Sequence, residues 1–283
     1  MANLIKDVNS AGDVDKSRSK HQEEENISLW VKTQRIWDFT LEVLYKEMGA
    51  VLTHAYQFLY SLVNSNPHGL NPEKIHLTGS SNKRAKIVIL LHGMKSGPYA
   101  FFPLASVLHQ SGVRNVFTAR LKQTTDNLVP SQAIATKILE IAEKSFDQGA
   151  KEVEVALIGH SLGALAASKY IWRHGHEVSN VTVNMMVSIA GRLRFIENRF
   201  HWFCKDLEME IDLTFKEIQR DPDKVQLYTL SGSDDGIVPS ESVHIHDDDS
   251  RQFVSEGVGH LGVIFSKEGL IKIAEWTHLW TRK

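Results

Sequence analysis

Ser161 lies in the stretch GHSLG at residues 159–163, between an apolar run and a segment with helical periodicity. A glycine-flanked serine between a strand and a helix is the pattern of a nucleophile elbow. The sharp turn needs the small residues Gly159 and Gly163, and it lifts the hydroxyl above the sheet. The helix that starts there offers free backbone N–H groups next to the hydroxyl. The stretch therefore predicts a nucleophile at Ser161.

An acyl-transfer nucleophile needs N–H donors for the oxyanion that forms when it attacks a carbonyl group. The step His92-Gly93-Met94 follows the apolar run 85–91 and predicts one donor, the backbone N–H of Met94. The second predicted donor is the N–H of Leu162, directly after the serine. We expect Gly93 to let the backbone approach the substrate, and the His92 ring to support the loop. The alternative is a simple turn at the end of a strand.

A serine hydroxyl also needs a histidine base, and that base needs a carboxylate to orient it. The stretch SGSDDGIVP at 231–239 follows another apolar run and offers Asp234 and Asp235. At this point either aspartate could be the acid, and a turn without a catalytic role is the alternative for the whole stretch.

The base is predicted at His260, within the glycine-rich stretch 257–262. The chain has 14 histidines, so one histidine alone means little. His260 is favoured because serine, acid and histidine then follow in the chain order typical of a nucleophile-elbow enzyme. His160 is a poorer candidate because its side chain leaves the elbow in another direction.

These residues all come directly after predicted strands. Strands are predicted at 75–79, 85–91, 115–121, 152–159, 181–190, 225–232 and 252–255, and helices at 99–110, 131–148, 161–174 and 267–280. Alternating strands and helices predict a mostly parallel sheet of about six strands with helices on both faces. Such sheets hold ligands at the carboxyl ends of their strands, which is where the candidate residues fall.

The order and spacing of these motifs resemble the α/β-hydrolase superfamily, specifically its lipase- and esterase-like members, over about residues 75–283. The HG step at 92–93 is similar to the family's oxyanion loop, and Gly259-His260 to its histidine loop. In the family's acid loop the acid lies four residues before a proline, here Pro239, which selects Asp235. The resemblance implies a reduced α/β-hydrolase fold and a Ser161-His260-Asp235 triad. The stretch AGRLR at 190–194 departs from the steps that many such lipases carry there.

Composition bounds the class of protein. The chain has 283 residues and a formal net charge of −2, which argues against a dedicated nucleic-acid binder. Its one cysteine, Cys204, excludes an internal disulfide and a cysteine-based metal cage. We find no signal peptide and no long apolar span, and expect a cytoplasmic protein, although export by an unrecognised signal stays open.

Three regions lie outside the predicted catalytic core. Residues 1–26 are polar and predicted to be a mobile tail, and 27–70 form a helical extension before a domain at 71–283. The extension carries one long amphipathic helix over 27–64, or two with a break near Gly49. We expect its apolar stripe to pack on the domain, with a membrane-surface or protein contact as the alternative. The aromatic-rich segment 192–224 is predicted either to cap an acyl pocket or to be an ordinary packed helical pair.

The residues together predict a serine hydrolase that cleaves carboxylic esters, with a small ester or lipid as substrate and no cofactor. A thioesterase or acyltransferase with the same triad, or a non-catalytic binding protein on a hydrolase scaffold, is the alternative. His244, His246 and the acidic run 247–249 suggest a metal site at first sight. We predict no metal, because a solvated loop of this composition is far commoner. The sequence does not define the oligomeric state.

Overall fold

A computed structural model describes residues 47–62, 70–79, 83–121, 128–174, 178–193, 225–244 and 249–283. All of these ranges fall within one compact unit that spans Glu47–Lys283. The predicted tail 1–26, the first part of the extension and nearly all of the predicted cap lie outside the described residues.

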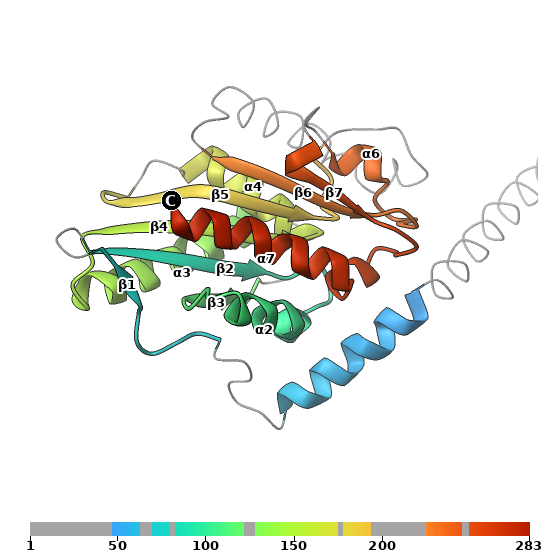
Figure 1. The fold of residues 1–283 in the computed structure, drawn as a ribbon, viewed down its shortest axis with the longest axis horizontal. Helices are drawn as coiled ribbons and strands as arrows, with labels where there is room; N and C mark the ends of the chain where they lie inside the picture. Colours follow the sequence, from blue (N-terminus) through green and yellow to red (C-terminus); the bar gives the residue numbers. More distant parts are fainter. Residues whose placement is uncertain are drawn as a thin grey trace, which may run out of the picture. The chain divides into compact units, whose positions relative to one another are not determined.

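A seven-stranded sheet forms the centre of the described region (Figure 1). Its main path runs β1-β2-β4-β5-β6-β7, and β3 pairs with β2. Every pair is parallel except β1–β2. The strands are β1 (Leu77–Thr78), β2 (Arg84–Leu91), β3 (Val116–Ala119), β4 (Glu152–His160), β5 (Val181–Ile189), β6 (Gln226–Gly232) and β7 (Gln252–Ser255).

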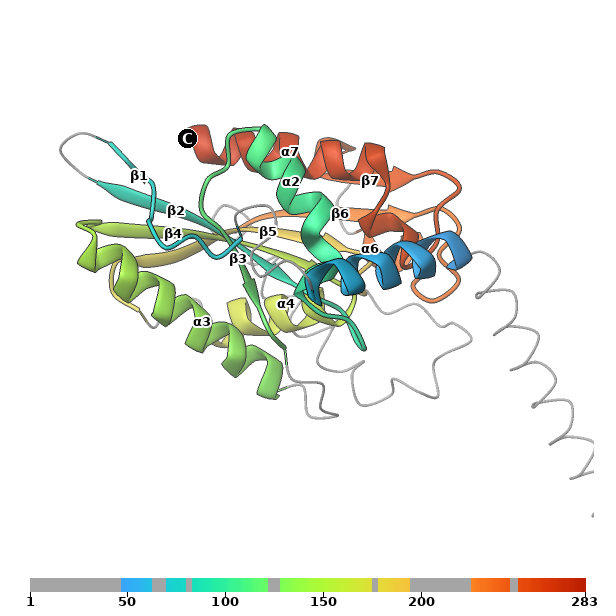
Figure 2. The same ribbon diagram turned by 90° about the horizontal axis from the view of Figure 1, so that it is seen from below.

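Helices cover both faces of this sheet (Figure 2). One face carries α3 (Leu128–Asp147) and α4 (Leu162–His174), and the other carries α2 (Phe102–Gln110) and α7 (Lys267–Arg282). Short elements complete the described chain: η2 (Pro98–Phe101), α6 (Ser240–Val243), η4 (Asp249–Arg251) and η5 (Gly262–Ile264). The mostly parallel α/β architecture predicted from the sequence is confirmed.

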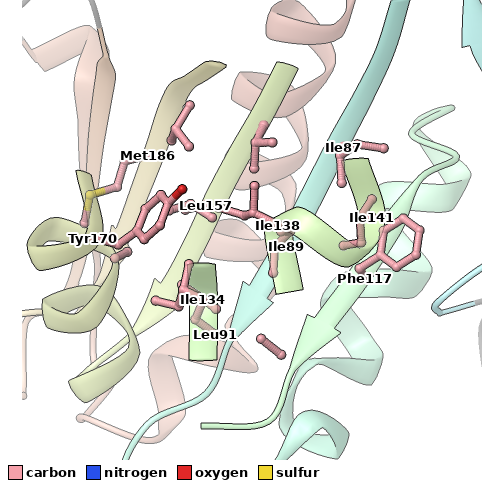
Figure 3. Packing of buried hydrophobic residues seen from close by; sticks show 14 of the residues in the cluster. Ile87, Ile89, Leu91, Phe117, Ile134, Ile138, Ile141, Leu157, Tyr170 and Met186 are labelled. Carbon is pink, nitrogen blue, oxygen red and sulfur yellow. The ribbon is translucent and has the colours of Figure 1, made fainter. Parts of the chain in front are cut away.

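The two core layers follow from alternation along the buried strands. Ile87, Ile89 and Leu91 of β2 point to the layer of α3 and α4, where they join Ile134 and Ile138 (Figure 3). Val88 and Leu90 point to the opposite layer, which includes α2 and α7. Because β2 is buried on both faces, it reads as one continuous apolar run rather than as an alternating pattern.

Strand register brings the predicted site residues to one edge of the sheet. Leu91 at the end of β2 pairs with Gly159 of β4, and Gly159 pairs with Ser188 of β5. Farther along the sheet, the end of β6 at Gly232 pairs with Ser255, the end of β7. The segments that follow β2, β4, β6 and β7 therefore leave the sheet on the same side.

Several predicted boundaries differ from the structure. The strand predicted over 75–79 is only the two-residue β1, and it runs antiparallel. The strand predicted over 115–121 is four residues long. Helix α3 begins at Leu128 rather than at residue 131, because its first turn tolerates Pro130. Helix α4 begins at Leu162 rather than at Ser161, since Ser161 has a left-handed φ of 52°.

The described part of the N-terminal extension is a helix over 47–62 that continues through Gly49. Several members of the apolar stripe do not face inward as we expected from their spacing: Met48, Leu59 and Leu62 are 51–66% exposed. The buried residue of this helix is Glu47. Phe58 and Tyr60, however, pack against Tyr99 and Phe102, so the helix does contact the domain through part of the expected stripe. The expectation is wrong for the exposed members, and the alternative, a membrane-surface or protein contact of 27–64, stays a prediction.

Among the described residues, no helix has the length and apolar character needed to span a membrane.

Candidate active site

Ser161 occupies a strained turn between β4 and α4. Its φ is 52°, and its backbone N–H donates to the Ile189 carbonyl at 2.9 Å, which ties the turn to β5. A non-glycine residue in this region costs about 1–3 kcal/mol and occurs where the surroundings enforce it. A β-carbon on Gly163 would lie 2.1 Å from the Leu91 carbonyl oxygen, and one on Gly159 would lie 2.5 Å from the Ala164 nitrogen. Only glycine fits at these two positions.

His260 lies next to the serine hydroxyl, although 99 positions separate the two residues in the chain. Its Nε2 is 3.0 Å from Ser161 Oγ, within hydrogen-bond distance. The ring is held at its other nitrogen, where Nδ1 lies 2.8 Å from Asp235 Oδ2. Because a carboxylate accepts only, Nδ1 carries the proton and Nε2 can accept the proton of the serine hydroxyl.

Asp235 is fully enclosed, with a side chain that is 0% exposed. Its Oδ1 accepts hydrogen bonds from the backbone N–H groups of Ile237 at 2.9 Å and Val238 at 2.8 Å. These two bonds leave Oδ2 for His260. A buried carboxylate needs such partners, since an unpaired one is very costly to desolvate.

Asp234 points elsewhere, and the structure thus separates the two candidate acids. Its side chain is exposed and accepts a bond from the neighbouring Ser233 hydroxyl at 3.2 Å. Its backbone N–H donates to the Val258 carbonyl and so links the acid loop to the histidine loop. The structure brings Asp235, and not Asp234, together with Ser161 and His260.

His160, beside the nucleophile, supports the histidine loop. Its Nε2 lies 2.9 Å from the His260 carbonyl oxygen and donates to it. Burial, with a smaller effect of the neighbouring His260, lowers the pKa of His160 to about 3. The ring therefore stays neutral at ordinary pH and places no positive charge beside His260.

His92 braces the loop that follows β2. The Leu121 backbone N–H donates to His92 Nε2 at 3.1 Å, so Nδ1 carries the proton and donates to the Gly93 carbonyl at 2.9 Å. Burial lowers the pKa of His92 and favours this neutral form.

The same loop lies directly against the elbow. A β-carbon on Gly93 would sit 3.2 Å from Ser161 Cβ, so the backbone at residue 93 passes beside the serine. The next residue, Met94, has an exposed side chain. Leu162 is the first residue of α4, and its backbone N–H has no acceptor within the helix. Both predicted donors thus belong to segments that flank Ser161.

The histidine-rich stretch after α6 contains no metal site among the residues that the structure describes. His244 has both ring nitrogens engaged: Nδ1 is 2.9 Å from Thr229 Oγ1, and Nε2 is 2.8 Å from Ser231 Oγ. These bonds brace the end of β6 before the acid loop. His246 lies outside the described ranges.

Two residues of helix 47–62, Glu47 and His54, reach this region and were not predicted from the sequence. The Glu47 carboxylate accepts bonds from the backbone N–H groups of Leu261 and Gly262, both at 3.0 Å. The His54 ring packs edge-on against Tyr99 with a centroid distance of 5.0 Å. No local sequence pattern predicts these contacts, because their partners are distant in the chain: Glu47 and Leu261, for example, are 214 positions apart.

Comparison with known proteins identifies the fold. No protein-family model matches the chain, and no curated protein matches its sequence. A solved esterase from Pyrobaculum calidifontis is 13% identical, with a TM-score of 0.56, and the match covers 82% of this chain and 93% of the esterase.

Two smaller proteins are also similar in structure. A ydeN-like hydrolase from Pectobacterium atrosepticum is 19% identical with a TM-score of 0.43, and the match covers 69% of this chain and 91% of that protein. The ydeN gene product of B. subtilis is 15% identical with a TM-score of 0.46, and the match covers 70% of this chain and 99% of that protein. The chain has the α/β-hydrolase fold that its motifs resemble.

Proposed function

We propose that this protein is a serine hydrolase that cleaves carboxylic esters through a Ser161-His260-Asp235 triad. One observation carries the proposal: a continuous chain of hydrogen bonds runs from Ser161 Oγ through both ring nitrogens of His260 to Asp235 Oδ2. Ser161 and His260, and His260 and Asp235, are thus each within hydrogen-bond distance, which is the geometry that nucleophilic catalysis by serine requires.

The reaction begins when Ser161 Oγ attacks the acyl carbon and His260 Nε2 takes the hydroxyl proton. The tetrahedral intermediate collapses as His260 gives that proton to the leaving alcohol, which leaves the acyl group on Ser161. Water then attacks the acyl-enzyme while His260 takes one of its protons. Collapse of the second intermediate releases the carboxylic acid and returns the proton to Ser161. Asp235 holds the imidazole in the required tautomer and stabilises its cation.

The oxyanion of each intermediate is assigned to the backbone N–H groups of Leu162 and Met94. Two features support the assignment: the position of Leu162 at the start of α4, and the passage of the Gly93 backbone beside Ser161. Each such donor contributes about 3 kcal/mol to stabilisation of the transition state.

Ester hydrolysis is favoured over the other reactions of this triad by one comparison only, the fold shared with the solved esterase. A thioesterase or acyltransferase would use the same residues and differ in leaving group or acceptor. A binding protein on this scaffold would not need the serine hydroxyl at all. The substrate class is therefore proposed as a small ester or lipid, and the segment 192–224 as its acyl-binding cap.

A panel of p-nitrophenyl esters from acetate to palmitate tests the proposal, with wild type and Ser161→Ala compared at equal concentration. We expect wild type to hydrolyse at least one ester and Ser161→Ala to fall about a millionfold in kcat. Equal rates for the two folded proteins would contradict it. A thioester panel in parallel discriminates the thioesterase, and an acyl-chain optimum tests the cap.

A further inference from the structure

Helix 47–62 reaches the segment that carries His260 through a buried carboxylate. Glu47 is 4% exposed, although a glutamate is almost never buried without partners. Its two oxygens are used separately: Oε1 accepts from Leu261 N–H and Oε2 from Gly262 N–H, each at 3.0 Å. These are the two residues that directly follow His260.

The histidine loop is shaped to receive this carboxylate. A β-carbon on Gly259, the residue before His260, would lie 2.3 Å from Glu47 Oε1 and 2.7 Å from Glu47 Cδ. The backbone at 259 therefore passes close to the Glu47 side chain, and the glycine there leaves room for it. Glu47 thus contacts the chain on both sides of His260.

A second support holds the same loop at His260 itself, since the His160 ring donates to the His260 carbonyl at 2.9 Å. Asp235 holds the ring of His260. The position of the His260 backbone depends on contacts made by the loop itself. Glu47 and His160 supply such contacts at residues 260–262, beside the bonds that the Val258 and Gly259 carbonyls accept from backbone N–H groups. The loop contains three glycines, at 257, 259 and 262, which have more conformational freedom than other residues, so each contact that restrains its backbone matters.

The same helix also packs on the segment that follows the oxyanion loop. The rings of His54 and Phe58 lie edge-on to Tyr99, with centroid distances of 5.0 and 5.3 Å. His54 further contacts Phe265, beyond the histidine loop, at 6.3 Å. The helix is therefore seated on both sides of the site, which keeps Glu47 in place.

We propose that Glu47 is a positioning residue for the catalytic base, and that its two hydrogen bonds hold the 259–262 turn so that His260 Nε2 faces Ser161 Oγ. The inference rests on the proposed triad and extends it to a helix outside the sheet and its covering helices.

The test compares wild type with Glu47→Gln and Glu47→Ala, using p-nitrophenyl acetate as the probe. An amide in place of the carboxylate presents an NH₂ group to one of the two N–H donors, so Glu47→Gln loses one bond with little change in shape. We expect kcat to fall about tenfold in Glu47→Gln and about a hundredfold in Glu47→Ala, with KM changed by less than about twofold. Glu256→Gln, an exposed carboxylate in the preceding turn, is the matched control and should keep wild-type kinetics.

Two measurements on the folded proteins do not depend on any substrate. Amide hydrogen exchange at Leu261 and Gly262 should accelerate in both Glu47 variants. The far-downfield proton resonance of the His260–Asp235 hydrogen bond should shift or broaden. Unchanged kcat, exchange and resonance in Glu47→Ala would overturn the proposal.

Failure of the proposed function gives a different result. If wild type hydrolyses no ester, the ester hydrolase assignment fails, and the exchange and resonance data alone decide on Glu47. A change in both then supports its role in placing His260, and no change refutes it. A fall in thermal stability with unaltered kcat and resonance would also refute it, because Glu47 would then be structural only.

Discussion

The two ends of the parallel sheet both hold buried or half-buried charges, but they use them differently. At the starting ends of β2 and β4, Lys86 Nζ lies 2.9 Å from the Trp280 carbonyl oxygen and 3.4 Å from Glu154 Oε2. Arg84 extends this network to Glu152 at 3.0 Å. These contacts tie β2 to β4 and to the end of α7.

At the carboxyl ends of the strands the polar groups form a chain rather than a closed network. Asp235 is saturated by three donors, but Ser161 Oγ at the other end of the chain is bonded only through His260 among the described contacts. Ser161 is partly exposed, so a substrate can reach its hydroxyl group. Buried charge alone therefore does not mark a candidate site, whereas an accessible hydroxyl at the end of a satisfied chain of hydrogen bonds does.

The largest effect should come from removing the base. We expect His260→Gln to lower kcat on an active ester about a millionfold, because no other described group lies within hydrogen-bond distance of Ser161 Oγ to take its proton. The midpoint of unfolding in urea should change little. Steady-state kinetics and a urea titration of the same preparation check both halves, and activity within tenfold of wild type would contradict the role of His260.

Next in size is the acid. In Asp235→Asn the side-chain oxygen can still accept from Ile237 and Val238, but the amide then donates toward His260 Nδ1 and forces the wrong tautomer. A fall of about ten-thousandfold in kcat is expected. Asp234→Asn is the matched control, and the choice between the two aspartates is wrong if Asp234→Asn shows the larger loss.

Low pH should lower the free energy of unfolding through His160, at the carboxyl ends of the strands, and not through the exposed His76. His160 has a pKa near 3 in the folded protein against 6.5 for a free histidine, so below pH 6.5 the unfolded state binds a proton that the folded state does not. The contribution of neutral His160 to the free energy of unfolding is therefore fully present above pH 6.5. It is lost as the pH falls toward 3, by up to about 1.4 kcal/mol per pH unit.

Urea unfolding of wild type and His160→Gln between pH 7 and pH 4.5 measures this slope. The glutamine keeps a donor for the His260 carbonyl but does not titrate, so the slope should flatten. His76→Gln, at an exposed histidine, should leave the slope as in wild type. Parallel curves for all three proteins would show that His160 does not carry the acid sensitivity.

The smallest effect is expected at the starting end of the sheet. Lys86→Met removes the donor to the Trp280 carbonyl and one partner of Glu154, while Arg84 remains 3.6 Å from that glutamate. A loss of about 2 kcal/mol in the free energy of unfolding follows, with kcat unchanged. Chemical denaturation and ester kinetics on the same samples check both expectations. A change in kcat without a change in stability would contradict the assignment of Lys86 to stability and not to the reaction.

The features that could be predicted from the sequence are those with a local pattern in it. A continuous apolar run predicted β2, and the glycines flanking Ser161 predicted the elbow, since both patterns follow from burial and close packing along the chain itself. Asp235 was selected over Asp234 because it lies four residues before Pro239, the spacing found in the acid loop of the family that the sequence resembles. The structure now places Asp235 against His260 by geometry.

Other features depend on contacts that no local pattern contains. The two-residue β1 exists because it pairs with the first residues of β2, and a pair that short has no periodicity of its own. Glu47 was missed because an acidic residue on an amphipathic helix is usually solvated, and its two partners lie more than 200 positions away. The exposure of Leu59 and Leu62 was missed for the same reason: the contacts that seat this helix are made with segments far away in the chain, and spacing alone does not show which of its sides makes them.

Fluorophosphonate labelling followed by peptide mass mapping tests the central claim most directly. The reagent bonds covalently only to a serine oxygen that an adjacent base has activated, so it reports the nucleophile without knowledge of the substrate. The account predicts one adduct, on Ser161, in wild type, and none in Ser161→Ala or His260→Gln. Absence of labelling in folded wild-type protein, or an adduct on another serine, would contradict it.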